Sequence, residues 1–122
     1  MNQGLIFRRK VLPHCIIEHS SPIEPADLNQ KVFQGALESN LFEPDGSDIK
    51  VRSIVYEHYQ TGSNKENFIH VTLRILSGRS DQDKHLLSNS VMSKLQSIPL
   101  VAASLTVEIV DMDRNSYSKQ IV

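Results

Sequence analysis

The sequence predicts one α+β domain in which a four-stranded mixed sheet carries two helices on one of its faces. Three observations support this fold class. The 122 residues are enough for one hydrophobic core and too few for two. Patterns typical of strand, helix and strand occur twice in succession, in units of about 45 residues, as expected of an internal duplication. A helix between two neighbouring strands makes those strands parallel through a right-handed crossover.

The first unit covers residues 13–60 approximately. Pro13 suits the first position of a strand, because proline donates no hydrogen bond to a sheet. Pro25 likewise suits the first turn of a helix. Apolar residues that recur at helical spacing, and residues that alternate in character, define the elements between the turns. They predict a strand, a helix and a second strand at 14–19, 26–40 and 49–59.

The second unit repeats this order over about 66–111. Ser80 is expected to cap its helix, since a serine hydroxyl accepts a hydrogen bond from the first turn. Asp81 and Asp83 lie in the first turn, where their negative charges interact favourably with the positive end of the helix dipole. The remaining residues give an N-terminal extension, 1–12, and a polar C-terminal tail that closes the single domain 13–122. A strand, a helix and a second strand are predicted at 68–76, 81–97 and 102–110.

With both helices on one face, the other face of the sheet is left uncovered. The sequence predicts strands that carry apolar residues on both sides. We therefore expect other copies of the chain to associate through the bare face.

Composition excludes several classes of protein. The net charge of -1 argues against a nucleic-acid-binding protein, which would carry a basic surface. No apolar run approaches the roughly 20 residues of a membrane span, and the start of the chain lacks the order of a targeting peptide. These features predict a cytoplasmic protein without nucleic-acid or membrane partners.

The single cysteine, Cys15, is expected to be a buried apolar residue. His70, in a predicted buried strand, is expected to be a hydrogen-bonded core residue. The histidines share no spacing typical of metal ligands, so no metal ion and no cofactor are predicted. They are His14, His19, His58, His70 and His85.

Two arginines are candidates for binding an anion. Arg79 lies in Ser-Gly-Arg-Ser, between the end of a strand and the start of a helix, where the helix N-terminus adds positive potential. Arg52 interrupts an otherwise apolar strand, so its charge must be exposed, paired or used on a ligand. Taken alone, each arginine is more simply explained as a solvated residue, Arg79 in a loop and Arg52 on the exposed face of an edge strand.

Several of these segments together resemble the tautomerase superfamily. Within it they are most similar to the 5-carboxymethyl-2-hydroxymuconate isomerase family, small trimeric enzymes of homoprotocatechuate breakdown in bacterial aromatic catabolism. The similarity extends from Pro13 to about Gln120, and Gly-Arg-Ser is its most specific local motif. The segments are Pro13–Glu18, Val51–Val55, Phe68–Leu73 and Gly78–Ser80.

The resemblance implies a tautomerase, or MIF-like, fold assembled as a homotrimer around packed sheets. It implies that the base is an amino-terminal proline, a role that maps onto Pro13, and that Arg52 and Arg79 bind and activate the substrate. The second unit has no proline at its start and has Ser104 where Arg52 would recur, so one site per chain is expected.

The implied reaction is a 1,3-proton shift, from enol to keto, on a di- or tricarboxylate such as a 2-hydroxymuconate. An α-amino group titrates near ~7.7–8.0 in peptides, and neighbouring guanidinium groups and an apolar wall should lower that pKa. The arginines would also bind carboxylates and stabilise the dienolate charge. Lys50, assigned to the opposite face of the strand from Arg52, and Tyr117 in the tail are further candidates for substrate binding.

One feature departs from the family pattern. Pro13 follows twelve residues, so its nitrogen is an amide without useful basicity. Initiation at position 12, where a UUG leucine codon can act as a bacterial start, would give a free Pro13 after removal of methionine. If the extension is genuine, the chain is instead a non-catalytic trimeric relative that binds anions or acts as a scaffold. A third alternative is another reaction on the same scaffold, such as decarboxylation, dehalogenation-type hydration or phenylpyruvate-like tautomerisation.

Overall fold

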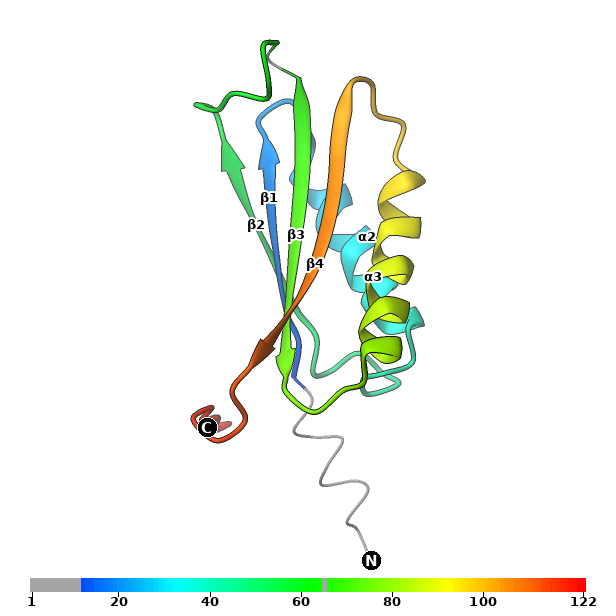
Figure 1. The fold of residues 1–122 in the computed structure, drawn as a ribbon, viewed down its shortest axis with the longest axis vertical. Helices are drawn as coiled ribbons and strands as arrows, with labels where there is room; N and C mark the ends of the chain where they lie inside the picture. Colours follow the sequence, from blue (N-terminus) through cyan, green and yellow to red (C-terminus); the bar gives the residue numbers. More distant parts are fainter. Residues whose placement is uncertain (1–11, 65) are drawn as a thin grey trace, which may run out of the picture.

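The computed structural model describes residues 12–64 and 66–122 (Figure 1). Of the predicted extension 1–12, only Leu12 therefore falls within the described residues. These residues form four strands and two helices in the predicted order. The elements are β1 (His14–Ser20), α2 (Pro25–Glu38), β2 (Lys50–Tyr56), β3 (Asn67–Leu76), α3 (Asp81–Gln96) and β4 (Ala103–Met112).

The strands form one mixed sheet in the order β2-β1-β3-β4. Each strand–helix–strand unit contributes a parallel pair, β1 with β2 and β3 with β4. The two units meet where β1 pairs with β3 in antiparallel orientation. Both helices lie on the same face of the sheet (Figure 1). The predicted tandem arrangement is thus confirmed.

Strand lengths follow from the availability of a neighbour. β2 ends at Tyr56, three residues before the predicted end at Tyr59, because β1, its neighbour among the described strands, has its last paired residue at Ser20. β4 instead runs to Met112, beyond its predicted end, because β3 continues beside it to Leu76. A strand without a neighbour has no partner for its backbone groups, so pairing sets both ends.

The helix ends are set by local hydrogen bonds. The predicted cap is confirmed: the Ser80 hydroxyl accepts from the backbone N–H of Asp83 at 3.1 Å. α2 ends two residues earlier than predicted, at Glu38. The Ser39 hydroxyl donates to the Ala36 carbonyl at 2.6 Å, and Asn40 then turns the chain with a φ of 61°.

The core lies between the helices and the sheet. The helices approach closely at Gly35, where an added Cβ would lie 2.8 Å from the Val91 Cα, so only glycine fits without a shift of backbone. Opposite the helices, alternate strand residues supply the other wall of the core. Its fully buried large apolar residues are Ile17, Leu28, Val32, Ile69, Val71, Leu73, Ile75, Leu87, Val91 and Leu95.

The uncovered face of the sheet is largely polar, so the prediction of strands that are apolar on both sides is wrong. The registers place alternate residues of each strand together on this open face. It carries few apolar side chains, Ile16, Ile54, Phe68 and Val110 among them. Because it can be hydrated, association through it stays a prediction. Its polar residues include His14, Glu18, Lys50, Arg52, Tyr56, His70, Thr72, Arg74, Thr106 and Glu108.

Within the described residues, neither helix has the length and apolar character that a membrane span requires.

Candidate functional site

His14, the residue after Pro13, is the centre of a hydrogen-bonded cluster on the open face. Its Nδ1 atom lies 3.3 Å from a terminal nitrogen of Arg52, and its Nε2 atom lies 2.9 Å from the hydroxyl oxygen of Tyr117. The rings of His14 and Tyr117 meet edge to face, with their centroids 6.3 Å apart. Two predicted site residues, Arg52 and Tyr117, are therefore joined through a residue that the sequence did not single out.

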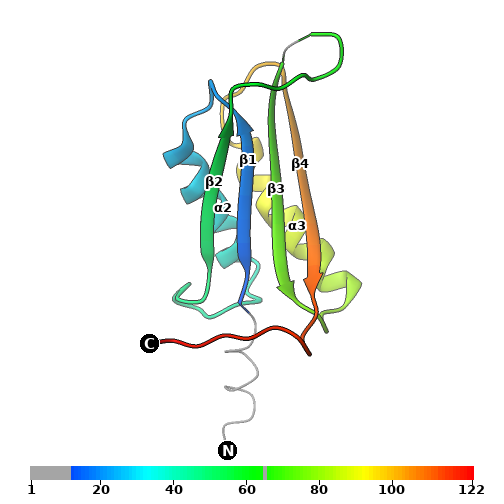
Figure 2. The ribbon, with the colours of Figure 1, turned by 90° about the vertical axis from the view of Figure 1, so that its left-hand side faces the viewer.

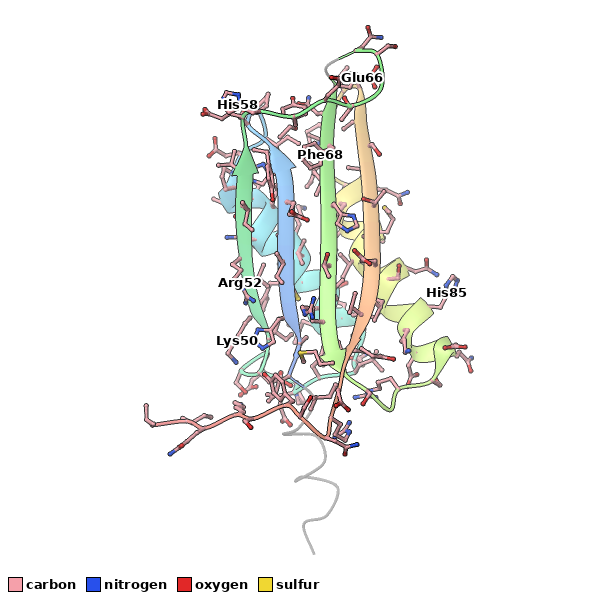
Figure 3. All side chains as sticks on the ribbon, turned by 60° about the vertical axis from the view of Figure 1, so that its left-hand side comes forward. Lys50, Arg52, His58, Glu66, Phe68 and His85 are labelled. Atoms are coloured by element: carbon pink, nitrogen blue, oxygen red, sulfur yellow. The ribbon has the colours of Figure 1, made fainter. Side chains whose placement is uncertain are left out.

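The strand register explains why these groups meet. β1 and β2 run parallel with His14 opposite Lys50 and Ile16 opposite Arg52. Lys50 and Arg52 thus lie on the same face of β2, and the assignment of Lys50 to the opposite face is wrong, since residues two apart along a strand share a face. Figure 3 shows both side chains near the lower end of β2, the end from which Pro13 leads into β1.

The cluster is strongly cationic. Burial lowers the pKa of His14 below its usual value, and the charges of surrounding cations lower it further. A neutral ring is therefore favoured near pH 7, while the cations themselves offer a site to an anion. These cations come from β2, β3 and the tail: Arg52, Lys50, Arg74 and Lys119.

The C-terminal tail passes across the end of the sheet where this cluster lies. Figure 2 shows it running below β1 and β2 after it leaves β4. It begins with a turn in which the Ser116 hydroxyl donates to the Asp113 carboxylate at 2.9 Å. This course brings Tyr117, which is half-buried, to His14, and Lys119 to the same end of the sheet.

Pro13 is fully buried, and its carbonyl accepts a hydrogen bond from the backbone N–H of Lys50 at 3.2 Å. Leu12, bonded to the Pro13 nitrogen, is 4% exposed and lines a groove of about 630 Å³. The ring nitrogen is therefore an amide, and the leucine bonded to it is itself buried. The other residues that line this groove are Glu43, Ser47, Asp48, Lys119 and Ile121.

One residue that lines this groove, Asp48, carries a buried carboxylate. Asp48 accepts from the backbone N–H of Glu43 with both carboxylate oxygens, at 3.2 and 3.3 Å. Burial raises the pKa of Asp48 above its usual value. These bonds hold the connection between α2 and β2 in place beside Pro13.

Arg79 lies in a different environment. Its guanidinium group donates to the carbonyl of Leu41 at 2.6 Å and lies 3.6 Å from the carboxylate of Asp83. It lines a cavity of about 480 Å³ together with residues from the end of α2 and the loop that follows. These contacts join Arg79 to the α2–β2 connection, and its expected place beside Pro13 and Arg52 stays a prediction.

Cys15 is buried in the core, whereas His70 lies on the open face of the sheet. Cys15 is fully buried, and burial raises the pKa of its thiol to about 12, as expected of an unreactive apolar residue. His70 is hydrogen-bonded as expected, to Thr106 and Glu108 at 2.6 and 2.7 Å. Its predicted place in the core is wrong, because the alternation of β3 directs it to the half-exposed open face.

Across the described residues, no group of three or more histidine, cysteine or acidic side chains is arranged to hold a metal ion. The cluster around His14 is instead composed of donors and cations, which suit carboxylate oxygens.

Sequence reasoning missed three members of the cluster: His14, Arg74 and Lys119. The alternation of His70, Thr72 and Arg74 in β3 was a usable signal, because a residue two positions from another lies on the same face. His14 has the same phase relative to the buried Cys15. The sequence holds no comparable signal for Lys119, whose place depends on the course of the tail.

Comparison with protein families gives a match over residues 13–120 to the model for 5-carboxymethyl-2-hydroxymuconate isomerase. Comparison with curated protein sequences gives no match.

Solved structures share the fold. A 5-carboxymethyl-2-hydroxymuconate delta-isomerase is similar with a TM-score of 0.74 and 16% identity, over 96% of this chain and 92% of that chain. A 5-carboxymethyl-2-hydroxymuconate isomerase from Deinococcus radiodurans R1 gives a TM-score of 0.71 and 20% identity, over 91% and 90% of the two chains. A fused 4-OT symmetric trimer gives 0.68 and 13%, over 82% and 85%. The tautomerase, MIF-like fold is therefore confirmed.

Proposed function

The chain belongs to the 5-carboxymethyl-2-hydroxymuconate isomerase family, and on this premise we propose that it catalyses an enol-to-keto 1,3-proton shift on a carboxylate-rich 2-hydroxymuconate. 5-Carboxymethyl-2-hydroxymuconate is the proposed substrate, and the ring nitrogen of Pro13 is the proposed base. One observation carries the proposal: the family match begins at residue 13, the proline that would act as the base. Activity then requires a protein in which Pro13 is the first residue.

The charges around His14 support a substrate with several carboxylates. A tricarboxylate carries up to three negative charges at neutral pH, and Arg52 can bind one carboxylate in bidentate fashion. Lys50, Arg74 and Lys119 add positive charge at the same end of the sheet.

The proton transfer proposed for Pro13 balances within the substrate. The unprotonated ring nitrogen takes the proton of the enol hydroxyl, and the electron pair of that O–H bond stays on the substrate as the negative charge of a dienolate. The protonated nitrogen then gives its proton to the carbon two atoms from that oxygen, so a C–H bond forms and the enolate oxygen becomes a ketone oxygen. Arg52, and Arg79 if it reaches the site, would stabilise the negative charge of the dienolate.

A homotrimer is the proposed assembly. Two proteins that share the fold are symmetric trimers of fused 4-OT chains. The edge strand β2 of this chain also exposes Ile54 and Val55, by 46% and 51% respectively. An exposed edge strand with apolar side chains is suited to contact with another subunit.

The function is tested with a protein that begins at Pro13, mixed with 5-carboxymethyl-2-hydroxymuconate. Loss of the ultraviolet absorbance of the dienol should be faster than in buffer alone, and proton NMR should identify the ketone. 2-Hydroxymuconate, which lacks the third carboxylate, should be converted with a lower kcat/KM. No acceleration with either compound would contradict the proposed function.

Replacing Arg79 with glutamine tests whether this residue serves the same site. If Arg79 binds substrate, Arg79→Gln should raise the KM for the tricarboxylate by about tenfold or more, as expected for a lost charge-assisted hydrogen bond. The melting temperature should be measured alongside, since the same change removes the bond to the Leu41 carbonyl. A lower melting temperature with unchanged kinetics would limit Arg79 to a structural role.

A second candidate function is that of a non-catalytic protein that binds anions. The observation that favours it is the burial of Pro13 behind Leu12. In this case the protein beginning at Pro13 would bind 5-carboxymethyl-2-hydroxymuconate, measured by calorimetry, and would leave its absorbance unchanged.

A further inference from the structure

We infer that His14 is a positioning residue that fixes the direction of the Tyr117 hydroxyl, so that this hydroxyl donates its proton to a carboxylate or enolate oxygen of the ligand. The inference rests on the proposed function in one respect only, namely that an anion binds at the cationic cluster. Beyond the proposed function, the inference assigns the Tyr117 hydroxyl as a hydrogen-bond donor to the ligand and His14 as the residue that orients this hydroxyl.

The first step is the protonation of the His14 ring. A guanidinium group has donors only, so the 3.3 Å contact with Arg52 requires Nδ1 of His14 to accept. A neutral imidazole has one donor and one acceptor. The ring proton must therefore be on Nε2, the atom that faces Tyr117.

The second step is the direction of the bond to Tyr117. Nε2–H of His14 donates to the phenolic oxygen over 2.9 Å. The hydroxyl acts as the acceptor in this bond, so its own O–H remains to be donated elsewhere. Among the described residues, His14 is the one hydrogen-bond partner recorded for the Tyr117 hydroxyl.

The third step concerns the acceptor for the O–H group of Tyr117. The groups around His14 include four cations, which attract an anion to this end of the sheet. A hydroxyl that donates to a carboxylate or enolate oxygen forms a charge-assisted hydrogen bond, stronger than one between neutral groups. Burial and the neighbouring cations keep the His14 ring neutral, which preserves the acceptor at Nδ1. The cations are Lys50, Arg52, Arg74 and Lys119.

The tautomer can be measured without any ligand or turnover. Long-range proton–nitrogen NMR spectra of the full chain at pH 8 should show His14 with the proton on Nε2 and with Nδ1 unprotonated. In Arg52→Leu, which removes the donor to Nδ1, both tautomers should be populated. A wild-type ring with its proton on Nδ1 would overturn the inference.

The donor role is tested by calorimetric binding of adipate, an unreactive six-carbon dicarboxylate. Tyr117→Phe and His14→Leu should each weaken binding by about 10- to 100-fold, the range for a hydrogen bond to a charged group. The double variant should bind within about twofold of Tyr117→Phe, because both changes remove one chain of hydrogen bonds. His14→Gln should recover most of the affinity, since its amide can donate at the position of Nε2.

Tyr56→Phe and His85→Leu are the matched controls. The Tyr56 hydroxyl donates to Glu18 at 2.6 Å, also on the open face, and His85 is exposed on α3. Both controls should bind adipate as the wild type does. Multiplicative losses in the double variant, wild-type affinity in Tyr117→Phe, or absence of saturable binding in the wild type would overturn the inference.

These measurements distinguish a failure of the inference about His14 and Tyr117 from a failure of the proposed function. If the expected tautomer and binding losses are found in a protein without isomerase activity, the inference holds and the proposed function fails. If isomerase activity is present and Tyr117→Phe leaves the KM and adipate affinity unchanged, the reverse is true.

Discussion

Adding one residue before Pro13 should reduce the enol-to-keto rate by about 10²–10⁴-fold relative to a protein that begins at Pro13, the usual contribution of a general base. The reason is chemical: a peptide bond to the ring nitrogen makes it an amide, which accepts no proton near neutral pH. The full chain should show the same loss, because Leu12 is bonded to that nitrogen through a peptide bond. Initial rates of dienol absorbance loss, at equal protein concentration, measure the effect.

The control for this comparison is one residue inserted after Ser63, in the exposed connection between β2 and β3. This insertion should leave the rate of the protein that begins at Pro13 unchanged within about twofold. Mass spectrometry of each protein establishes its first residue. Equal rates with free and blocked Pro13 would show that the proline nitrogen is not the base.

Arg52→Gln should lower kcat/KM by about 10²–10³-fold, the loss seen when a donor to a developing oxyanion is removed. Glutamine is shorter and uncharged but can still donate a hydrogen bond, so the change removes the positive charge and the paired donors of the guanidinium group. Arg52 also holds the His14 tautomer through its contact with Nδ1. The loss should therefore appear in both kcat and KM, measured with the protein that begins at Pro13.

Arg114→Gln is the matched control for Arg52→Gln. Arg114 is likewise exposed, and its Nε donates to the Ser77 carbonyl at 3.0 Å, a contact with a residue outside the His14 cluster. This control should retain kcat/KM within about threefold, and Arg52→Lys should fall between the two glutamine variants. Comparable losses in Arg52→Gln and Arg114→Gln would contradict a role for Arg52 in the reaction.

The local part of the fold was predictable because it depends on neighbours in the chain. The helical spacing of Leu28 and Val32 predicted α2. The capping hydroxyl of Ser80, followed by acidic residues, predicted where α3 starts. Strand boundaries were less accurate, because β2 ends where β1 no longer offers backbone partners. That limit is set by a strand more than thirty positions away in the chain.

Part of the candidate site was likewise predictable from the sequence. Arg52 was predictable because a charged residue in an apolar strand must be exposed, paired or used on a ligand. His14 was not predictable, since its role depends on contacts with β2 and the tail. Lys50 was assigned to the wrong face although the period of a strand already determined the right one. Arg79 was predicted from a motif, whereas its contacts with Leu41 and Asp83 depend on how the loops pack.

The sequence by itself determined the order of the elements and their parallel pairing within each unit. These follow from local periodicity and from crossover geometry. Only the tertiary structure decided that the open face is polar and that Tyr117 meets His14, a residue 103 positions away. The physical reason is that the directions of side chains on a sheet, and the path of a tail across its end, are fixed by the register between strands.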